Sequence, residues 1–176
     1  MFRLTEPTRL SEFERQVLPH LDAAYSLARF LLRNDQDAED VVQEASLRAF
    51  RFFESFRGEN CRAWFLSIVR NTSFTALKRS RTEEANVVFD EELHGTGSPP
   101  PDPGVALDLA QDRQTVRAAI EQLPVEFREA IALRELEGCS YKEIAEIAGV
   151  PIGTIMSRLA RARRQLRMIL SKTYTK

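Results

Sequence analysis

The chain has 176 residues, of which 43% are hydrophobic and 29% charged, and its formal net charge is −1. This composition is ordinary for a soluble globular protein with one medium or two small domains, and no apolar run approaches the about 20 residues that a membrane-spanning helix needs. The N-terminus lacks the apolar run of a secretory signal, so we expect a cytoplasmic protein with no membrane insertion of its own. Cys61 and Cys139 each lack a second ligand at metal spacing, which argues against a disulfide framework or a metal site. A redox role for either thiol stays open.

The first half of the sequence predicts three helices. Residues 10–33 carry apolar side chains at intervals of three and four. Residues 35–53 begin with acids, which suits the positive end of a helix dipole, and residues 62–81 continue the helical spacing. The expected apolar face of the second helix consists of Val42, Ala45, Ala49 and Phe52. That of the third consists of Phe65, Ile68, Val69, Thr72 and Ala76.

An acidic, proline-rich connector follows. Residues 82–112 contain eight acids and no lysine or arginine. Within them, "HGTGSPPPDPG" (residues 94–104) excludes a helix or a central strand. The whole connector spans roughly 25 residues, which is too long for a loop inside one compact domain. We therefore expect a flexible linker over residues 84–106 between domains at 1–83 and 107–176.

The second half also reads as helices, and no stretch of the chain shows convincing strand alternation. Helices are expected at 105–123, ending at Pro124, and at 124–137, ending at Gly138 in the left-handed conformation. Ser140 and Glu143 have the spacing of a capping box. The sequence thus predicts an all-α protein of two small helical domains.

The residues after Ser140 follow the pattern of a helix-turn-helix motif. A short helix from Ser140 meets a turn at Gly149-Val150-Pro151, and a second helix begins near Ile152. Glu146 is the last acid, and seven lysines or arginines follow it. This distribution is typical of a segment that lies against DNA, because phosphate contacts release counterions. The alternative is a helical hairpin with a solvated basic face.

In a helix-turn-helix, early exposed positions of the second helix face the major groove. Here these positions are Thr154, Ser157, Arg158 and Arg161, with Met156 and Ala160 as apolar contacts. Arg163, Arg164 and Arg167 follow at spacings suited to phosphates.

Two stretches carry a resemblance to a known family. "DAEDVVQEASLRAFRFFESFRG" followed by "CRAWFLSIVRNTSFTALKRSR" resembles region two of bacterial sigma factors of the extracytoplasmic-function (ECF) group. "LPVEFREAIALRELEGCSYKEIAEIAGVPIGTIMSRLARARRQL" resembles their region four. The resemblance implies a sigma factor that binds core RNA polymerase and directs promoter-specific transcription initiation, and not an enzyme. The isolated His20 and His94, and the lack of a glycine-rich phosphate loop, also disfavour catalysis.

The resemblance implies a polymerase contact on the second helix. Asp40, Gln43 and Glu44 match the family's "D-x-x-Q-E", which docks on the β′ clamp helices, and Leu47 adds an apolar contact. From the residues alone, an acidic helix start is more often explained by the helix dipole, and it is the resemblance that favours the polymerase contact. In the same way, the resemblance implies contact of the second domain with the β flap.

The resemblance assigns recognition and melting of the −10 promoter element to the third helix. Cations, an amide and an aromatic ring alternate on its expected exposed face, which suits single-stranded DNA. The expected −10 residues are Arg62, Arg70, Asn71, Phe74 and Lys78. Asn71, in "SIVRNT", is expected to line a pocket for a flipped base, with the loop at 56–61 as the other wall. Trp64 is either a stacking platform or a core residue.

The −35 element is expected to be read by the second helix of the motif. The predicted contacts are Thr154, Met156, Ser157, Arg158, Arg161 and Arg164. Met156 and Ala160 stand where related sequences carry arginine or an aromatic residue. The −35 sequence that another family member recognises therefore does not predict the −35 sequence that this chain recognises.

The resemblance also implies control by an anti-sigma factor and requires no cofactor or metal. The acidic linker either mimics nucleic acid near the polymerase active site or is a neutral spacer. Two other functions stay open: a sigma-like decoy that binds an anti-sigma protein and never DNA, and a one-component helix-turn-helix regulator. The hypothesis of a one-component regulator leaves the N-terminal domain unexplained.

Overall fold

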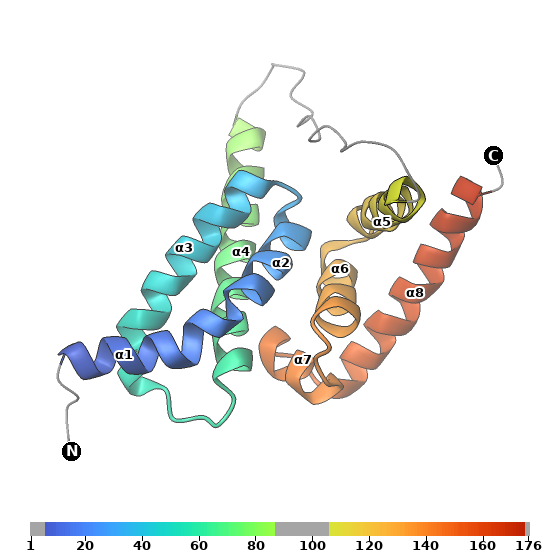
Figure 1. The fold of residues 1–176 in the computed structure, drawn as a ribbon. Helices are drawn as coiled ribbons and strands as arrows, with labels where there is room; N and C mark the ends of the chain where they lie inside the picture. Colours follow the sequence, from blue (N-terminus) through green and yellow to red (C-terminus); the bar gives the residue numbers. More distant parts are fainter. Residues whose placement is uncertain (1–5, 87–105, 175–176) are drawn as a thin grey trace.

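The computed structural model describes residues 6–86 and 106–174, and within them every regular element is a helix (Figure 1). The all-α prediction is confirmed. The predicted linker at 84–106 falls almost wholly on residues 87–105, outside the described residues.

The N-terminal half contains four α-helices and two 3₁₀ turns. They are α1 (Glu6–Val17), η1 (Leu18–His20), α2 (Leu21–Leu32), α3 (Asp35–Phe52), η2 (Phe53–Ser55) and α4 (Cys61–Asn86). The prediction of a single helix over residues 10–33 is wrong. Pro19 lies at the start of the 3₁₀ turn η1, and a proline has no N–H to continue an α-helix, so the chain divides there into α1 and α2.

The buried face of α3 differs from the expected one. Its buried residues are Ala38, Val41, Ala45 and Ala49. Val42 is only partly buried, and Phe52 is 55% exposed. The buried stripe therefore runs through Val41 where the sequence pattern favoured Val42, because α3 packs on α2 and α4 through small side chains that a pattern of large apolar residues does not reveal.

The C-terminal half contains four more α-helices and one π-helical turn. They are α5 (Ala106–Glu121), α6 (Val125–Ile131), η3 (Ala132–Leu136), α7 (Tyr141–Ala148) and α8 (Ile152–Tyr174). The helix expected over 124–137 is present, but its second part is wound as the π turn η3. Gly138 (φ 65°) and Gly149 (φ 66°) adopt the left-handed conformation that the sequence predicts after a helix end.

The start of α7 confirms the predicted capping box. The Ser140 hydroxyl oxygen accepts a hydrogen bond from the Glu143 N–H (3.2 Å), and Glu143 Oε2 accepts one from the Ser140 N–H (2.8 Å). These bonds satisfy two backbone donors that the helix itself leaves unpaired. They fix the entry of α7 and thereby its position before the turn into α8.

Replacing the cap, Ser140→Ala, is expected to lower the free energy of unfolding by about 1 kcal/mol. Equilibrium urea unfolding measures this. Ser157→Ala is the control, because that exposed hydroxyl donates only to a carbonyl in its own helix, Thr154 O. Equal stability of the two variants would contradict a capping role.

The cap also has a pH signature. The Ser140 N–H and the Asn60 amide hold the pKa of Glu143 below its ordinary value of 4.5. A carboxylate with a lowered folded pKa stabilises the fold above its unfolded pKa. We therefore expect the contribution of Glu143 to be lost as the pH falls below 4.5 through the folded pKa.

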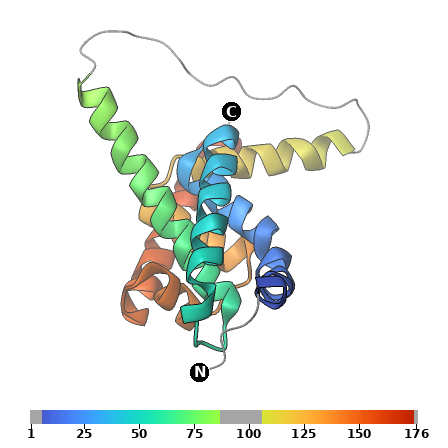
Figure 2. The same cartoon turned by 90° about the vertical axis from the view of Figure 1, so that its left-hand side faces the viewer.

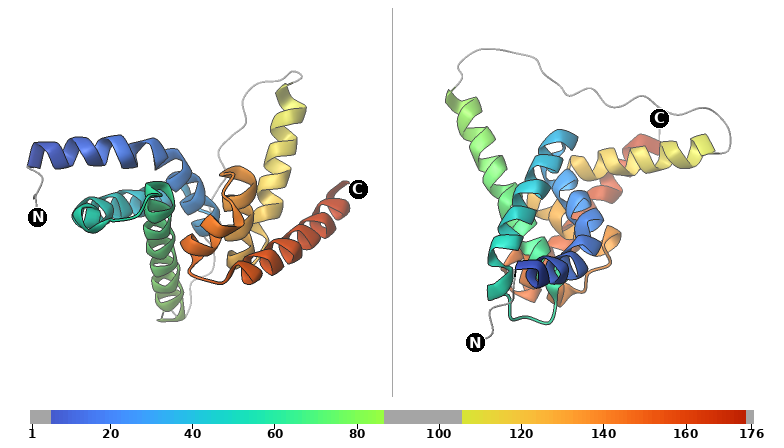
Figure 3. Two further views of the ribbon diagram at one scale, coloured as in Figure 1. Left: turned by 90° about the horizontal axis from the view of Figure 1, so that it is seen from below. Right: turned by 60° about the vertical axis from the view of Figure 1, so that its left-hand side comes forward.

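The two halves pack against each other. Helix α7 lies on α4, and α6 lies on α2. Buried side chains of both halves form one continuous core, with Leu27 and Phe65 on one side and Ile144 and Leu159 on the other. Figure 1 shows the blue-to-green half beside the yellow-to-red half. Figure 2 shows α4 and α5 diverging from the junction, and Figure 3 shows α1 and α8 extending to opposite sides.

Candidate nucleic-acid and partner interfaces

The four predicted polymerase contacts lie together on the open face of α3. Asp40, Gln43 and Glu44 are exposed, and Leu47 is 65% exposed, the most exposed large apolar side chain in the described residues. Within this face, Arg48 pairs with Glu44 along the helix. An exposed apolar side chain with polar and charged neighbours on the same helix has the anatomy of a docking surface.

Three of the predicted −10 residues of α4, namely Arg70, Asn71 and Phe74, form a local cluster. The guanidinium carbon of Arg70 lies 4.3 Å from the centre of the Phe74 ring, and its Nη1 donates to Asn71 Oδ1 at 3.3 Å. Asn71 and Lys78 are exposed, whereas Arg62, Arg70 and Phe74 are only partly exposed. The fold thus brings a cation, an amide and an aromatic ring together on one side of α4.

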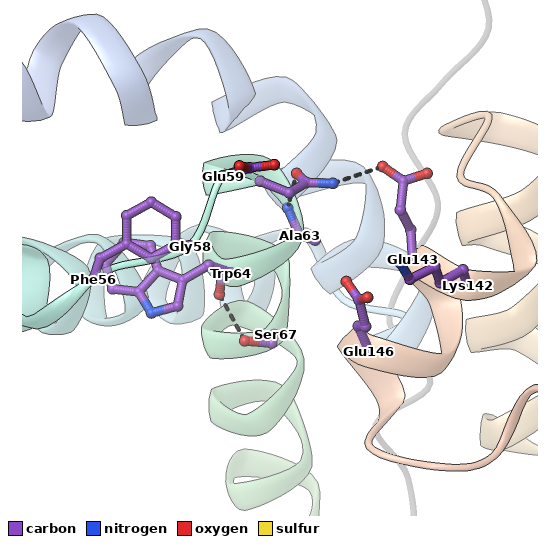
Figure 4. A pocket seen from close by; sticks show the side chains of 10 residues that line it. Phe56, Gly58, Glu59, Ala63, Trp64, Ser67, Lys142, Glu143 and Glu146 are labelled. Carbon is purple, nitrogen blue, oxygen red and sulfur yellow. Dashed lines mark hydrogen bonds between the residues drawn. The ribbon is translucent and has the colours of Figure 1, made fainter.

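A cavity of about 460 Å³ opens where the loop before α4 meets α7 (Figure 4). One wall carries Phe56 and Trp64, whose ring centres are 4.8 Å apart, with Ser67 one turn along α4. Trp64 also packs on the buried Phe53, with ring centres 6.4 Å apart. Trp64 therefore lies both at the edge of the core and in the cavity wall. Its two predicted roles, as a core residue and as a stacking platform, are both compatible with this position.

The opposite wall of this cavity comes from α7 of the C-terminal half. Lys142, Glu143 and Glu146 face Trp64 across it (Figure 4). Asn60 Nδ2 donates to Glu143 Oε1 at 2.8 Å and closes one side of the opening. The loop at 56–61 forms a wall of this cavity, but Asn71, which the sequence placed in the same pocket, is not among the lining residues, and the facing wall is the acidic helix α7.

Within the described residues, four ion pairs link the two halves, one of which joins Asp35 of α3 to Arg117 of α5. We call the other three the charge clasp: Arg29–Glu121, Arg62–Glu137 and Arg70–Glu129. Within the clasp, each arginine comes from the N-terminal half and each glutamate from the C-terminal half. Two of the three arginines, Arg62 and Arg70, are predicted −10 contacts. The expectation that these two are free for DNA is therefore wrong for this arrangement of the halves.

Further polar contacts support the clasp. Arg62 Nη2 donates to the Glu137 carbonyl oxygen at 2.6 Å. The buried Arg128 donates across the junction to the carbonyl oxygens of Phe30 and Leu31, both at 2.9 Å. Those carbonyls lie at the C-terminal, negative end of α2, so the cation matches the helix dipole. Burial lowers the pKa of Arg128 from its ordinary value.

Glu129 is the most buried member of the clasp, with its side chain 1% exposed. One carboxylate oxygen accepts from Arg70, and the other lies 3.5 Å from Arg158 Nη1 of α8. Neither that oxygen nor Arg158 Nη1 has a hydrogen-bond partner within residues 6–86 and 106–174. Burial raises the pKa of Glu129, and the two arginines oppose this effect.

The prediction that Arg158 is an exposed groove-facing residue is wrong. Its side chain is 20% exposed and points to Glu129. A buried carboxylate needs a cation nearby, and Arg158, one helical turn from the buried Ile155 and next to Leu159, is placed to supply it.

The other predicted −35 residues are accessible on the first turns of α8. Ser157, Arg161 and Arg164 are exposed, Met156 is 54% exposed, and Thr154 is partly exposed. Arg163 pairs with Glu135 of η3 at 2.7 Å and so is not a free phosphate contact in this structure. The predicted −35 residues that remain accessible to DNA are therefore Thr154, Met156, Ser157, Arg161 and Arg164.

Sequence reasoning missed Glu129, Arg128 and Asn60. Their importance arises from contacts that span 59 to 98 residues of sequence, such as Arg70 with Glu129 and Arg128 with Phe30. The one available signal was the pair of charges "RE" inside the apolar run of residues 123–133. Buried charges in such a run must be paired.

Two absences hold within the described ranges. No group of three or more histidine, cysteine or acidic side chains has metal-binding geometry in residues 6–86 and 106–174. In the same parts of the chain, no helix combines the length and the apolar character needed to span a bilayer.

Comparison with known proteins gives a consistent result for both halves. The sequence model "Sigma-70 region 2" matches residues 17–83, and "Sigma-70, region 4" matches residues 113–166. The ECF RNA polymerase sigma-E factor of Haemophilus influenzae is 39% identical over 147 residues, which cover 80% of this chain and 77% of that protein.

A longer alignment is found with the ECF RNA polymerase sigma factor SigE of Mycolicibacterium smegmatis. It is 33% identical over 163 residues and covers 93% of this chain but 63% of that protein. Among solved structures, the sigma factor RpoE in complex with the anti-sigma factor NepR from Bartonella quintana matches with a TM-score of 0.71. Its sequence is 32% identical, and the match covers 91% of this chain and 97% of that chain.

Proposed function

Because the chain belongs to the ECF group of the sigma-70 family, we propose that it is a promoter-specificity subunit of bacterial RNA polymerase. In this role the N-terminal half binds core polymerase and melts −10 DNA, and the C-terminal half reads −35 DNA. We retain the domain boundaries 1–83 and 107–176 as part of the proposal. We also propose that it acts in the cytoplasm and does no catalysis of its own.

One observation carries the proposal: two accessible surfaces of different chemistry lie on separate halves of one chain. The α3 face around Leu47 is acidic with an apolar centre, which suits a protein partner. The first turns of α8 present Arg161 and Arg164 on a helix without acids, which suits DNA. A one-component regulator needs only the second surface.

In the polymerase complex, α3 would dock on the β′ clamp helices and the C-terminal half on the β flap. Helix-on-helix docking through a central leucine with a polar rim requires no rearrangement of α3, since its face is already open. We expect the free chain and core polymerase to elute together in gel filtration. Separate elution, in the absence of any inhibitor, would refute the proposal.

At −10 DNA, the Arg70, Asn71 and Phe74 cluster would hold unstacked bases of the non-template strand. The cation over the Phe74 ring leaves the amide of Asn71 accessible beside a stacking surface. Lys78 continues the exposed side of α4 by two turns and would contact phosphates. The cavity beside Trp64 would take the flipped base after α7 has moved away.

An anti-sigma protein is the proposed regulator. A second cavity, of about 610 Å³, lies between α2 and α5, with Val116 (40% exposed) and Leu136 (48% exposed) on its rim. Its apolar walls and charged edge fit an amphipathic helix of a protein partner. The solved RpoE structure that this fold resembles is itself in complex with an anti-sigma factor.

The decoy function is less well supported. A protein that binds only an anti-sigma factor has no need of Asn71, Arg161 and Arg164 on exposed helix faces, yet the chain has all three. A binding test with promoter DNA separates the two functions, because a decoy would bind neither core polymerase nor DNA at a detectable level.

A further inference from the structure

Two arginines of α8, Arg158 and Arg163, lie on opposite sides of the stripe that this helix buries. The stripe consists of Ile155, Leu159 and Ala162, each of which is at most 1% exposed. At about 100° per residue around the helix axis, Arg158 projects roughly 70° to one side of the stripe and Arg163 roughly 70° to the other. The helix therefore carries a cation on each flank of its buried face.

Each of these arginines pairs with a glutamate of the segment on which α8 packs. Arg158 Nη1 lies 3.5 Å from Glu129 Oε2 in α6. Arg163 donates to Glu135 Oε1 in η3 from Nη2 at 2.7 Å and from Nε at 3.2 Å. Helix α6 packs on α8 and continues directly into η3 (Figure 1). Because the two pairs lie on both flanks, α8 cannot rotate about its own axis without breaking one of them.

The two pairs differ in burial, and so in strength. The Glu129 and Arg158 side chains are 1% and 20% exposed, whereas those of Glu135 and Arg163 are 48% and 45% exposed. Loss of one member of a buried pair leaves the other charge buried and uncompensated, whereas water screens a half-exposed pair. Glu129 also accepts from Arg70, but its pair with Arg158 lies wholly within the C-terminal half.

The rotation of α8 decides which side chains can reach base edges. Arg161 and Arg164 are exposed and project away from the buried stripe. A rotation of about 20° moves an atom on the helix surface, about 5–6 Å from the axis, by about 2 Å. That displacement is enough to break a hydrogen bond to a base edge in the major groove.

We propose that Glu129 and Glu135 are positioning residues for −35 recognition, which fix the rotation of α8 through Arg158 and Arg163. This inference rests on the proposed function. Arg158 then contributes to the reading of DNA through the orientation of Arg161, and not by contacting a base. The carboxylates of α6 and η3 thus influence base preference from inside the domain.

The test measures base preference with the full chain bound to core polymerase. Two pools of promoter DNA are used, one randomised at the −35 element and the other at the −10 element, and the bound fraction is sequenced. Glu129→Gln should reduce the preference for the best −35 sequences by about tenfold, which is the discrimination that one bidentate base contact supplies. Glu135→Gln should reduce it by about threefold, because its pair is half exposed. The −10 preference should stay at the wild-type value in both variants.

Arg158→Gln distinguishes an anchor from a DNA contact. It should change the −35 preference in the same way as Glu129→Gln, and the double variant should be no worse than either single one, because no buried charge is then left unpaired. If Arg158 instead contacts a base, Glu129→Gln frees this arginine and raises the affinity for the preferred −35 sequence, whereas Arg158→Gln lowers it. Such opposite signs would overturn the inference.

Glu126→Gln is the matched control. It removes the same charge from the same helix, α6, but Glu126 is exposed and has no ion-pair partner among the described residues. It reports the general gain in DNA affinity that follows the loss of any acid, and it should leave the −35 preference unchanged. A loss of preference equal to that of Glu129→Gln would show that net charge alone acts, and would refute a positioning role.

The remaining outcomes are also decisive. If Glu129→Gln loses its cooperative thermal transition, Glu135→Gln decides, and a wild-type −35 preference in that variant would overturn the inference. A changed −10 preference in Glu129→Gln would mean that Glu129 acts through Arg70, and would overturn it too. If the wild-type chain with polymerase selects no −35 sequence, the proposed function fails and the inference fails with it. Wild-type selection with unaltered variants refutes the inference alone.

Discussion

Leu47→Glu is expected to weaken binding to core polymerase at least about 30-fold and to abolish transcription at moderate protein concentrations. Leu47 is the apolar centre of the α3 face and is 65% exposed, so in the free chain its side chain packs little. Central apolar residues of docking surfaces contribute about 2 kcal/mol or more when they are fully desolvated by the partner. A glutamate there would have to be buried without a cation.

Because Leu47 is exposed, we expect its substitution to change polymerase binding without changing the stability of the fold. Glutamate is a good helix former, and no core contact is lost, so the free energy of unfolding should change by no more than about 0.5 kcal/mol. Leu10→Glu is the control, because Leu10 is a 47% exposed leucine that belongs to α1 and not to α3. Fluorescence anisotropy with labelled core polymerase gives both affinities. Equal affinities of the two variants for core polymerase would contradict a role of the α3 face in the interface.

Arg161→Ala should lower the affinity of the polymerase complex for promoter DNA by about 1–3 kcal/mol and relax the preference at one position of the −35 element. Arg161 is exposed, follows the turn at Gly149 by three helical turns, and has no ion-pair partner among the described residues. It is therefore free to reach a base edge in the major groove.

Arg164→Ala provides the contrast for this prediction. We expect a similar loss on every −35 sequence and a salt dependence reduced by about one counterion, since a phosphate contact carries no sequence information. Lys172→Ala, in the last turn of α8, should leave the affinity unchanged. Promoter variants in electrophoretic shift assays distinguish these outcomes, and identical profiles for Arg161→Ala and Arg164→Ala would contradict direct readout by Arg161.

Local signals in the sequence predicted much of the second half. The capping box at Ser140 and Glu143, and the left-handed glycines at 138 and 149, are decided by hydrogen bonds and backbone sterics within a few residues. The boundary between α1 and α2 was missed although Pro19 was visible, because the apolar spacing runs through it without interruption. Periodicity locates a buried face but does not detect a break that leaves this face continuous.

The state of the arginines was not predictable from local pattern. Arg158 and Arg161 are three residues apart on one helix, yet one points to a buried glutamate and the other to solvent. The difference depends on Glu129, 29 residues earlier, whose burial follows from the packing of α6 on α8. In the same way, the coverage of Arg62 and Arg70 depends on how the two halves pack against each other, which no spacing in the sequence encodes.

Reconstituted transcription with purified core polymerase tests the central claim most directly, namely that one chain joins a polymerase-docking half to a promoter-reading half. Run-off products from a fragmented genomic DNA pool should appear only when the chain is added, and their start sites should share two sequence elements at a fixed spacing. Start sites identical to those of core polymerase alone, or stimulation without any shared element, would contradict the account.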